Sequence, residues 1–308
     1  MRSFLGFLVV LGLSVGAATQ VLNVPMDYPT IQEALDAAQP GARIEVAAGT
    51  YTENLVIEKD VVLVGEGKAV VQLKAANPNR PVISIVGGKA EIQGITLKGG
   101  LQGIVVGPLA SLVLSAARIE GNKGRGLLVL SDAVITDCEV EGNKGTGIEI
   151  WAFGSEAVIE DTEISGNGRD GIFLGRGELE LRGSKVERNA LSGVEVWGFS
   201  LASLSGNTVA NNRDGVVVWG EAKASVEANT IKENTRDGVL LVGKVKVEIA
   251  GNEIKGNGAW GIAVWTKACH GDAGGWAFNG EVTGEGNKVS GNGKGDLCGV
   301  PGSLRKGG

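Results

Sequence analysis

The chain has 308 residues, of which 51 are glycine and 7 are proline, and its formal net charge is -6. Glycine at this level without a Gly-X-Y period excludes a collagen-like chain, and a hydrophobic content of 43% excludes an intrinsically disordered one. Because an acidic surface repels phosphate backbones, we expect no nucleic-acid partner.

Residues 1–18 have the order of a secretory signal peptide: a basic residue, Arg2, then an apolar run over 4–15, then small residues at 16–18. The apolar run is too short to span a membrane. The alternative is a buried N-terminal strand, but the order of the residues favours the signal peptide. We therefore expect a single mature domain over 19–308 that is secreted, periplasmic or held at the cell surface.

The first element of the mature chain is an amphipathic helix over 30–38. Thr30 and Glu33 have the spacing of a capping box, in which each side chain satisfies a free backbone N–H at the helix start. Pro40-Gly41 ends the helix. Short apolar strands follow at 43–47, 55–57, 61–64, 70–73 and 82–86. Residues 21–100 are therefore predicted to form an N-terminal cap and the first coils of a strand stack.

Residues 101–265 repeat one unit, which is tracked by an asparagine that returns every 21 to 24 residues and, at the end, after 35. This column comprises Asn122, Asn143, Asn167, Asn189, Asn212, Asn234, Asn257 and Asn292. Each unit holds three apolar pieces of two or three residues, which are too short for helices. If each unit is one turn of a coil, each piece pairs in parallel with its copy about 4.8 Å away, and the stacked turns bury one core.

The recurring asparagines and glycines are predicted to be architecture and not a ligand site. Identical Asn side chains carry a donor and an acceptor, so they can bond one another and the turn backbone along a column. A second column holds Ala117, Cys138, Thr162, Ser184, Asn207, Asn229, Asn252 and Asn287. Glycines such as Gly215 mark places that need a positive φ or have no room for a Cβ atom.

The segment from Tyr28 to Leu55 (YPTIQEALDAA…GARIEV…GTYTENL) resembles the N-terminal cap and first coil of the right-handed parallel β-helix proteins of the pectin-lyase-like group. The Asn-x-x-x-Gly-[Ile/Val] repeats resemble the later coils of that group, particularly its carbohydrate-binding/sugar-hydrolase-type repeat modules and the periplasmic NosD-type proteins. The resemblance covers nearly the whole mature chain. It implies an all-β, right-handed parallel β-helix of roughly ten coils with one N-terminal capping helix. It does not imply one activity, because the group includes lyases, hydrolases, esterases, epimerases and binding proteins.

The sequence offers little for histidine or metal chemistry. Its one histidine, His270, lies outside any Gly-His-Gly or Asp-Pro-His-Asp motif, which disfavours the histidine-dependent mechanisms of the group and a His/Cys metal site. NosD-type proteins are linked to copper delivery, but one His, three Cys and two Met supply few soft ligands. No cofactor and no metal are predicted from these residues.

Three Arg-Asp-Gly triplets supply the candidate carboxylates, and they begin at Arg169, Arg213 and Arg236. Arg213-Asp214 and Arg236-Asp237 should lie on adjacent coils about 5 Å apart, close enough for an acid/base pair or a shared Ca²⁺. The arginines would suit the carboxylate of an acidic sugar. The alternative is that each Asp closes its turn through its own backbone bonds, with the Arg–Asp pairs solvated along an edge.

An aromatic column follows the repeated Gly-apolar-x-apolar strand. Its members, and the neighbouring outward phenylalanine, are Trp151, Phe173, Trp197, Trp219 and Trp265. These side chains alternate outward from the inward aliphatic residues, so they predict an exposed line of rings that suits the faces of sugar residues. The alternatives are that a loop carrying Phe153 or Phe199 covers the line, or that it is a contact between copies of the chain or with an envelope protein.

The long interval before Asn292 reflects an insert, and residues 266–308 are predicted to form this insert and the C-terminal cap. Cys269 and Cys298 would form a disulfide that pins the cap in an oxidising compartment. Cys138 is predicted to be a small buried residue.

Three functions remain open from the sequence. The leading hypothesis is an exported protein that binds a polysaccharide or cell-envelope glycan along the tryptophan column. The second is a polysaccharide lyase or glycoside hydrolase that uses Arg213, Asp214, Arg236 and Asp237. The third is a structural or assembly role in the envelope, in which the column meets a protein.

Overall fold

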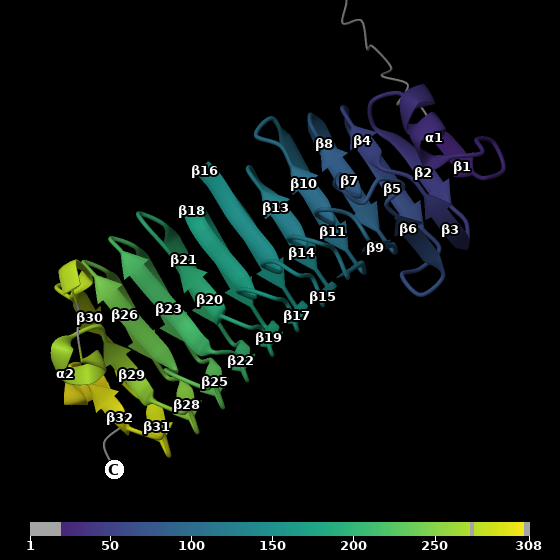
Figure 1. Cartoon of the computed structure of the whole chain (residues 1–308). Coiled ribbons are helices and arrows are strands. Elements are labelled where there is room, and N and C mark those ends of the chain that lie inside the picture. Colours follow the sequence, from purple (N-terminus) through teal and green to yellow (C-terminus); the bar gives the residue numbers. More distant parts are fainter. Residues whose placement is uncertain (1–19, 272–273, 305–308) are drawn as a thin grey trace, which may run out of the picture.

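The computed structural model describes residues 20–271 and 274–304, which form one stack of parallel coils (Figure 1). Each regular coil contributes a short strand to each of three sheets, which we number in the order in which the chain enters them within a repeat. The predicted signal peptide at 1–18 lies outside the described residues. Within those residues no helix is long and apolar enough to cross a membrane.

The first sheet consists of β4 (Leu55–Ile57), β7 (Ile83–Ile85), β10 (Ile104–Val106), β13 (Leu127–Val129), β16 (Ile148–Glu160), β18 (Ile172–Arg182), β20 (Ser192–Val196), β23 (Asp214–Gly220), β26 (Val239–Gly243), β29 (Trp260–Val264) and β32 (Gly295–Cys298). The second sheet consists of β1 (Val21–Val24), β2 (Ala42–Val46), β5 (Val61–Gly65), β8 (Gly88–Gln93), β11 (Ala110–Ser115), β14 (Ala133–Thr136), the later halves of β16 and β18, β21 (Leu201–Ser205), β24 (Lys223–Glu227), β27 (Lys246–Ala250) and β30 (Glu281–Thr283). The third sheet consists of β3 (Gly49–Thr52), β6 (Val71–Lys74), β9 (Thr96–Lys98), β12 (Arg118–Glu120), β15 (Glu139–Glu141), β17 (Glu163–Ser165), β19 (Lys185–Glu187), β22 (Thr208–Ala210), β25 (Thr230–Lys232), β28 (Glu253–Lys255) and β31 (Lys288–Ser290).

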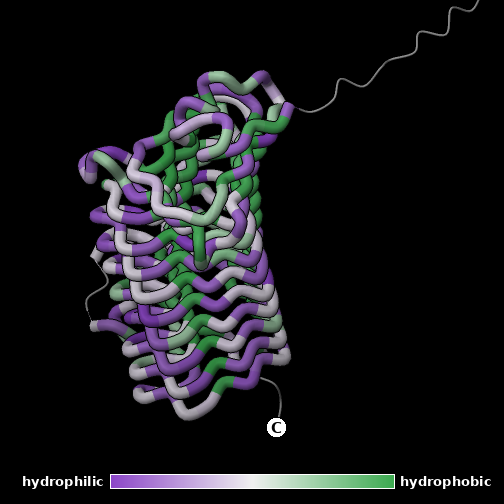
Figure 2. Tube along the Cα trace, turned by 90° about the vertical axis from the view of Figure 1, so that its right-hand side faces the viewer, coloured by the Kyte–Doolittle hydropathy of each residue, from purple (hydrophilic) through white to green (hydrophobic). Residues whose placement is uncertain are grey.

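This arrangement confirms the predicted right-handed parallel β-helix. The third sheet has eleven strands in the described chain, one per coil, where we expected about ten. Equivalent residues stack in register: Val194, Val216 and Val239 are Cα partners in successive coils, and all three are buried. Figure 2 shows hydrophobic positions lined up from coil to coil along the stack. The core is therefore one continuous column of aliphatic side chains between the three sheets.

The asparagine column forms the predicted ladder. Asn212, which is buried, accepts hydrogen bonds at Oδ1 from the backbone N and the Nδ2 of Asn189, at 2.9 and 3.1 Å. Its own Nδ2 donates to the carbonyl of Val186 at 3.0 Å and to Oδ1 of Asn234 at 3.2 Å. Each rung thus satisfies buried backbone groups that a bend in the coil leaves without strand partners.

The predicted N-terminal helix is α1 (Ile31–Ala37), and it covers the first coil at the end of the stack (Figure 1). The backbone N–H of Glu33 donates to Oγ1 of the N-cap Thr30 at 3.2 Å, as the capping box predicts. The carboxylate of Glu53 accepts the N–H groups of Ile31 and Gln32 at 3.0 and 2.9 Å. A residue from the next strand region therefore completes the cap.

The C-terminal end is closed by the insert and by short helices. These helices are α2 (Lys267–His270), η1 (Gly274–Trp276) and η2 (Gly302–Leu304). Leu304 is fully buried, and its carbonyl accepts the Nδ2 of Asn287 at 2.7 Å, which ends the second polar column. Both ends of the described stack are thus covered, and its sheet edges are protected.

Candidate functional site

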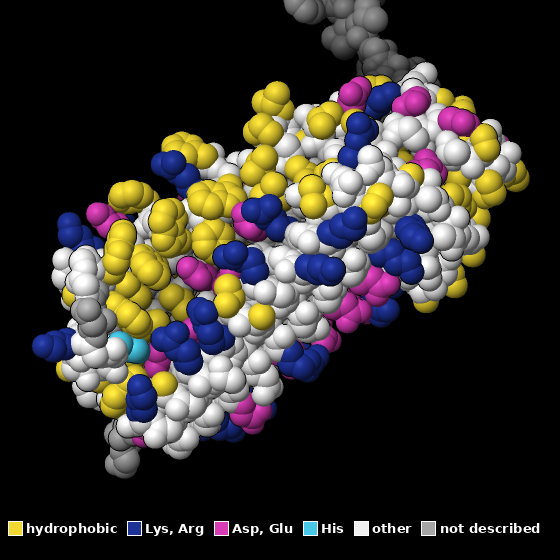
Figure 3. Space-filling model, in the orientation of Figure 1, with side chains coloured by type: hydrophobic (Ala, Val, Ile, Leu, Met, Phe, Trp, Pro, Cys, Tyr) yellow, Lys and Arg dark blue, Asp and Glu magenta, His cyan; other side chains and the backbone are white. Residues whose placement is uncertain are grey.

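The outer face of the first sheet is hollowed over the C-terminal half of the stack. Three hollows of about 400, 370 and 360 Å³ lie there, and neighbouring hollows share Trp151 or Trp219 in their linings. We call the three together the groove, and the hollow of 370 Å³ the C-terminal cavity. Figure 3 shows hydrophobic side chains gathered over this face and bordered by Lys and Arg. The aromatic lining comprises Trp151, Phe173, Trp197, Trp219, Trp265 and Trp276.

Two tryptophans form an exposed platform in the groove. The side chains of Trp151 and Trp197 are 39% and 40% exposed, and their ring centroids lie 6.4 Å apart. Phe173 packs against Trp151 at 5.7 Å. The intervening coil has Gly175 beside this ring, and a Cβ atom there would lie 2.7 Å from the ring of Trp151. The glycine therefore leaves room for the Trp151 ring to lie across the neighbouring coil.

The exposed line predicted from the sequence does not extend to Trp219 and Trp265. Both are half-buried, because Trp276 of the insert packs against Trp219 at 5.7 Å and His270 stacks on Trp265 at 4.6 Å. The predicted covering segments do not provide this cover, since Phe153 and Phe199 are 72% and 76% exposed.

Beneath the insert lies a second apolar cluster on the outside of the coil. Outward-facing Val217, Leu240, Val242 and Ala263 are buried there, packed against Trp219, Trp260 and Trp265. The C-terminal cavity therefore has an apolar floor that belongs to the first sheet and an aromatic wall that belongs partly to the insert.

The predicted carboxylate pair is buried and already engaged. Asp214 and Asp237 are 2% and 0% exposed. Asp237 Oδ1 accepts the backbone N–H of Trp260 at 3.0 Å, and its Oδ2 lies 2.9 Å from Nε2 of His270. Asp214 Oδ2 accepts from Nε of Arg213 at 2.9 Å.

These contacts bear on both sequence interpretations of the triplets. Asp237 is sealed under α2 and is not one half of an open acid/base pair with Asp214. The carboxylates are also buried and not solvated: Asp170 Oδ1 accepts the N–H of Ser192, and Asp237 that of Trp260, each one coil further on. The buried carboxylates therefore join successive coils, as the asparagines do.

A carboxyl group that the sequence did not single out lies on the groove floor. Glu195 occupies an outward position of β20, between Phe173 and Val217 in the neighbouring coils. Burial, reinforced by the negative charge of Asp170, raises its pKa to about 7, against a weaker opposing hydrogen bond from Ser192. Burial also raises the pKa of Asp170. Glu195 could have been noticed as an acidic residue in a column of outward apolar residues.

The described residues contain no group of three or more His, Cys, Asp or Glu side chains arranged to hold a metal ion. The Asp214–Asp237 pair, which would have suited Ca²⁺, has instead the Arg213 and His270 contacts. Ca²⁺ prefers six to eight oxygen ligands, and this pair offers few free ones.

The insert is fastened to the stack at several points. Cys269 and Cys298, the cysteines that the sequence pairs, form a disulfide with their Cα atoms 5.8 Å apart. Nε1 of Trp260 donates to the carbonyl of Cys269 at 3.1 Å, and His270 contacts Asp237. These contacts fix α2 over the last first-sheet strands. Cys138, as predicted, is buried with a free thiol, and burial raises its pKa to about 11.

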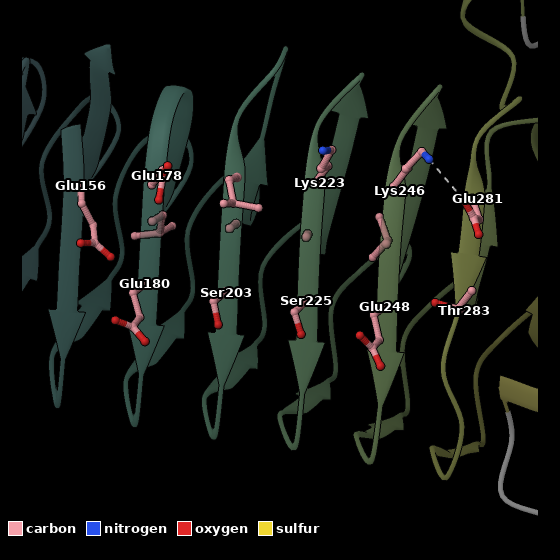
Figure 4. A pocket seen from close by; sticks show the side chains of 15 residues that line it. Glu156, Glu178, Glu180, Ser203, Lys223, Ser225, Lys246, Glu248, Glu281 and Thr283 are labelled. Atoms are coloured by element: carbon pink, nitrogen blue, oxygen red, sulfur yellow. Dashed lines mark ion pairs between the residues drawn. The ribbon is translucent and has the colours of Figure 1, made fainter. Parts of the chain in front are cut away.

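The outer face of the second sheet carries a different kind of hollow, of about 510 Å³ (Figure 4). Small residues such as Ser203 and Ser225 form its floor, and acidic and basic side chains stand along it, with Lys246 and Glu281 paired at 3.6 Å. No aromatic residue lines it. This charged trough lacks the rings and the buried carboxyl groups that distinguish the groove.

Comparison with protein families matches a family model described as a right-handed β-helix region over residues 81–194 and 147–300. Among curated proteins, a cell surface glycoprotein of Methanothermus fervidus is 32% identical over 95 residues, which is 30% of this chain and 16% of that protein. The chain thus spans only a small part of that relative.

Solved structures share the fold along most of the chain. The mannuronan C-5 epimerase AlgE4 A-module of Azotobacter vinelandii matches with a TM-score of 0.64 and 17% identity, over 90% of this chain and 95% of that one. The catalytic unit of a GH87 alpha-1,3-glucanase from Streptomyces thermodiastaticus matches with 0.64 and 16%, over 90% and 65%. A periplasmic alginate epimerase, AlgG, matches with 0.62 and 16%, over 92% and 81%. At these identities the likeness shows the fold alone.

Proposed function

Because the chain belongs to the family of right-handed β-helix proteins, we propose that it binds an extended polysaccharide in the groove. The observation that carries this proposal is the exposed pair Trp151 and Trp197. Flat rings in a hollow suit the apolar faces of sugar residues, and an exposed apolar strip of this kind is typical of a binding surface. The structural neighbours named as an alginate epimerase and a glucanase support a glycan ligand.

We place the protein outside the cytoplasm, as the sequence predicts. The Cys269–Cys298 disulfide supports this, because disulfides persist in oxidising compartments. The relative named as a cell surface glycoprotein and the neighbour named as a periplasmic epimerase agree with a location at or beyond the cell envelope. A cell-envelope glycan is then a ligand that the protein would meet.

The test is binding by isothermal titration calorimetry, after a glycan array has selected a ligand for the mature protein. Replacing Trp151 and Trp197 together by Ala should weaken Kd at least about tenfold, equivalent to about 1.4 kcal/mol. The matched control is Leu201→Ala, which removes an exposed apolar side chain from the charged trough and should leave Kd unchanged. Unchanged binding by the double variant would refute the groove as the glycan site.

The same double variant separates glycan binding from association through the rings. If the platform joins two copies of the chain, sedimentation should give a dimer for the wild type and a monomer for the variant. A wild-type monomer that binds glycan supports the proposal.

Cleavage of the bound glycan is a second candidate, favoured by Glu195. A carboxyl group with a pKa of about 7 can donate or accept a proton at neutral pH, and it lies on the floor beside Asp170 and Arg213. In this candidate function Glu195 is the carboxyl group that transfers the proton, in place of the sequence-predicted Asp237, which is buried under α2. The test is the appearance of new reducing ends from the array-selected glycan. Loss of product in Glu195→Gln, with Kd unchanged, would support cleavage, and no product from the wild type would exclude it for that glycan.

A further inference from the structure

The groove ends at the insert. Ser192 and Asp214 occupy equivalent positions in successive coils. In the next coil the equivalent residue is Asp237, which contacts His270 of α2. In the coil after that it is Trp260, whose backbone N–H donates to Asp237 and whose Nε1 donates to the carbonyl of Cys269. A chain lying along the groove toward the C-terminal end therefore meets α2 and not solvent. The C-terminal cavity is the last hollow before this barrier.

The cavity has two unlike sides. On one side stand Trp219, Trp265 and Trp276, above the apolar floor at Val217 and Leu240. Nε1 of Trp219 is a buried donor that has no hydrogen-bond partner among the described residues. The volume of about 370 Å³ is at the small end of the roughly 300–1,000 Å³ usual for ligand sites. It therefore suits the last residues of a glycan better than a long internal stretch.

The other side of the cavity carries an excess of positive charge. Arg213 and Arg236 both approach the single carboxylate of Asp214 through Nε, at 2.9 and 3.7 Å. Both contacts are made through Nε, and both arginine side chains are partly exposed, at 42% and 43%. Glu195 carries only part of a negative charge at neutral pH, because burial raises its pKa to about 7. The charged residues that line the cavity are thus two arginines, the carboxylate of Asp214 and the partly charged Glu195, so the lining can accept an anionic ligand.

We propose that the C-terminal cavity binds the terminal residue of an acidic glycan, with the sugar ring against the Trp219 wall and its carboxylate on the Nη atoms of Arg213 and Arg236. This inference rests on the proposed glycan binding and adds to it the class of ligand and the mode of binding, which is end-on. Because the insert closes the groove, it favours the end of a glycan chain over an internal stretch. The two arginines favour a glycan that carries negative charge.

The first test uses the ligand and needs no protein variant. Calorimetry is run on the full mature chain with oligogalacturonates and oligomannuronates of increasing length, and with the same oligomers after reduction of their carboxyl groups. We expect the acidic oligomers to bind more tightly, with one protein per glycan at every length. Modification of one chain end, at the reducing or the non-reducing terminus, should abolish binding.

The second test uses Arg236→Gln, chosen because its contact with Asp214 is the longer of the two. Its affinity for the acidic oligomers should fall about tenfold while its affinity for the reduced ones stays unchanged. The control is Arg182→Gln on the second sheet, where Arg182 pairs with Glu160. Circular dichroism melts show whether each variant is folded, and the end-modified oligomers decide the question if Arg236→Gln is not.

The outcomes separate this inference from the function on which it rests. If reduced oligomers bind as tightly as acidic ones, if neither end modification matters, or if the number of proteins per glycan rises with length, end-on acidic recognition is wrong and groove binding stands. If the wild type binds neither acidic nor reduced oligomers and no glycan of the array, the proposed function itself fails.

Discussion

Replacing Glu195 by Gln should make the protein more stable at alkaline pH, because burial disfavours the charged form of this side chain. Its pKa is raised from an ordinary 4.5 to about 7 by burial and by Asp170. Each pKa unit corresponds to about 1.4 kcal/mol, so the shift from 4.5 to about 7 sets an upper limit of about 3.5 kcal/mol. Since the side chain is only partly buried at the groove floor, we expect about 2 kcal/mol.

The sign of the change in unfolding free energy with pH follows from the protons bound by the folded and unfolded chains. Between pH 4.5 and 7 the folded protein holds a proton on Glu195 that the unfolded chain has released, so the free energy of unfolding falls as pH rises. The stabilisation is complete below pH 4.5 and is lost as pH passes 7. Asp170, whose pKa is also raised, adds to the wild-type decline but is retained in the variant. The difference between the two proteins therefore reports Glu195 together with its interaction with Asp170.

The assay is urea unfolding followed by circular dichroism, at one pH near 5 and one near 8. The free energy of unfolding of Glu195→Gln should decline less over this interval than that of the wild type, by about 2 kcal/mol. Glu178→Gln is the control, because Glu178 is exposed on the second sheet and should leave the wild-type decline intact. Equal declines in wild type and Glu195→Gln would refute the burial of a neutral carboxyl group in the groove.

Three further predictions follow from single contacts. Asn212→Ala removes four hydrogen bonds from the ladder and should lower the free energy of unfolding, measured in urea, by about 4 kcal/mol. The control Asn79→Ala, at an exposed position, should cost almost nothing, and equal losses in the two variants would contradict the ladder. Cys298→Ser should release the insert, so limited proteolysis should cut within 266–280 faster than in the wild type, and equal rates would show that the disulfide does not hold it. Gly175→Ala should weaken glycan binding by displacing the ring of Trp151, which its Cβ atom would meet at 2.7 Å, and an unchanged Kd would show that the ring position is not needed.

The fold was predictable because the same residue types recur at equivalent positions in many coils. The asparagine column recurs in coil after coil, so a pattern of hydrogen bonds between equivalent residues was visible without coordinates. The helix signal at Thr30 and Glu33 was equally local, and α1 begins and ends within a residue of its predicted bounds. The one unforeseen part of that cap, the carboxylate of Glu53, comes from another coil, and no local spacing reveals it.

The site was only partly predictable, because it depends on which residues the insert covers. Val217 and Leu240 are buried although they lie on the outside of the coil, because tryptophans pack against them. Two of these tryptophans are covered in turn by the insert, a segment more than 20 residues away from Val217 and Leu240 in sequence. The same segment brings His270 onto Asp237 and removes that carboxylate from the groove. The repeat predicts its own internal contacts well, but it carries no information on where a unique insert will dock.

The most direct test of the groove as a glycan site is a crystal structure of the mature protein soaked with an array-selected oligosaccharide. We predict that the sugar residues lie on the outer face of the first sheet, stacked on Trp151 and Trp197, with the chain end against α2. Density for the oligosaccharide in the charged trough of the second sheet, with the two tryptophan rings still exposed to solvent, would contradict the assignment.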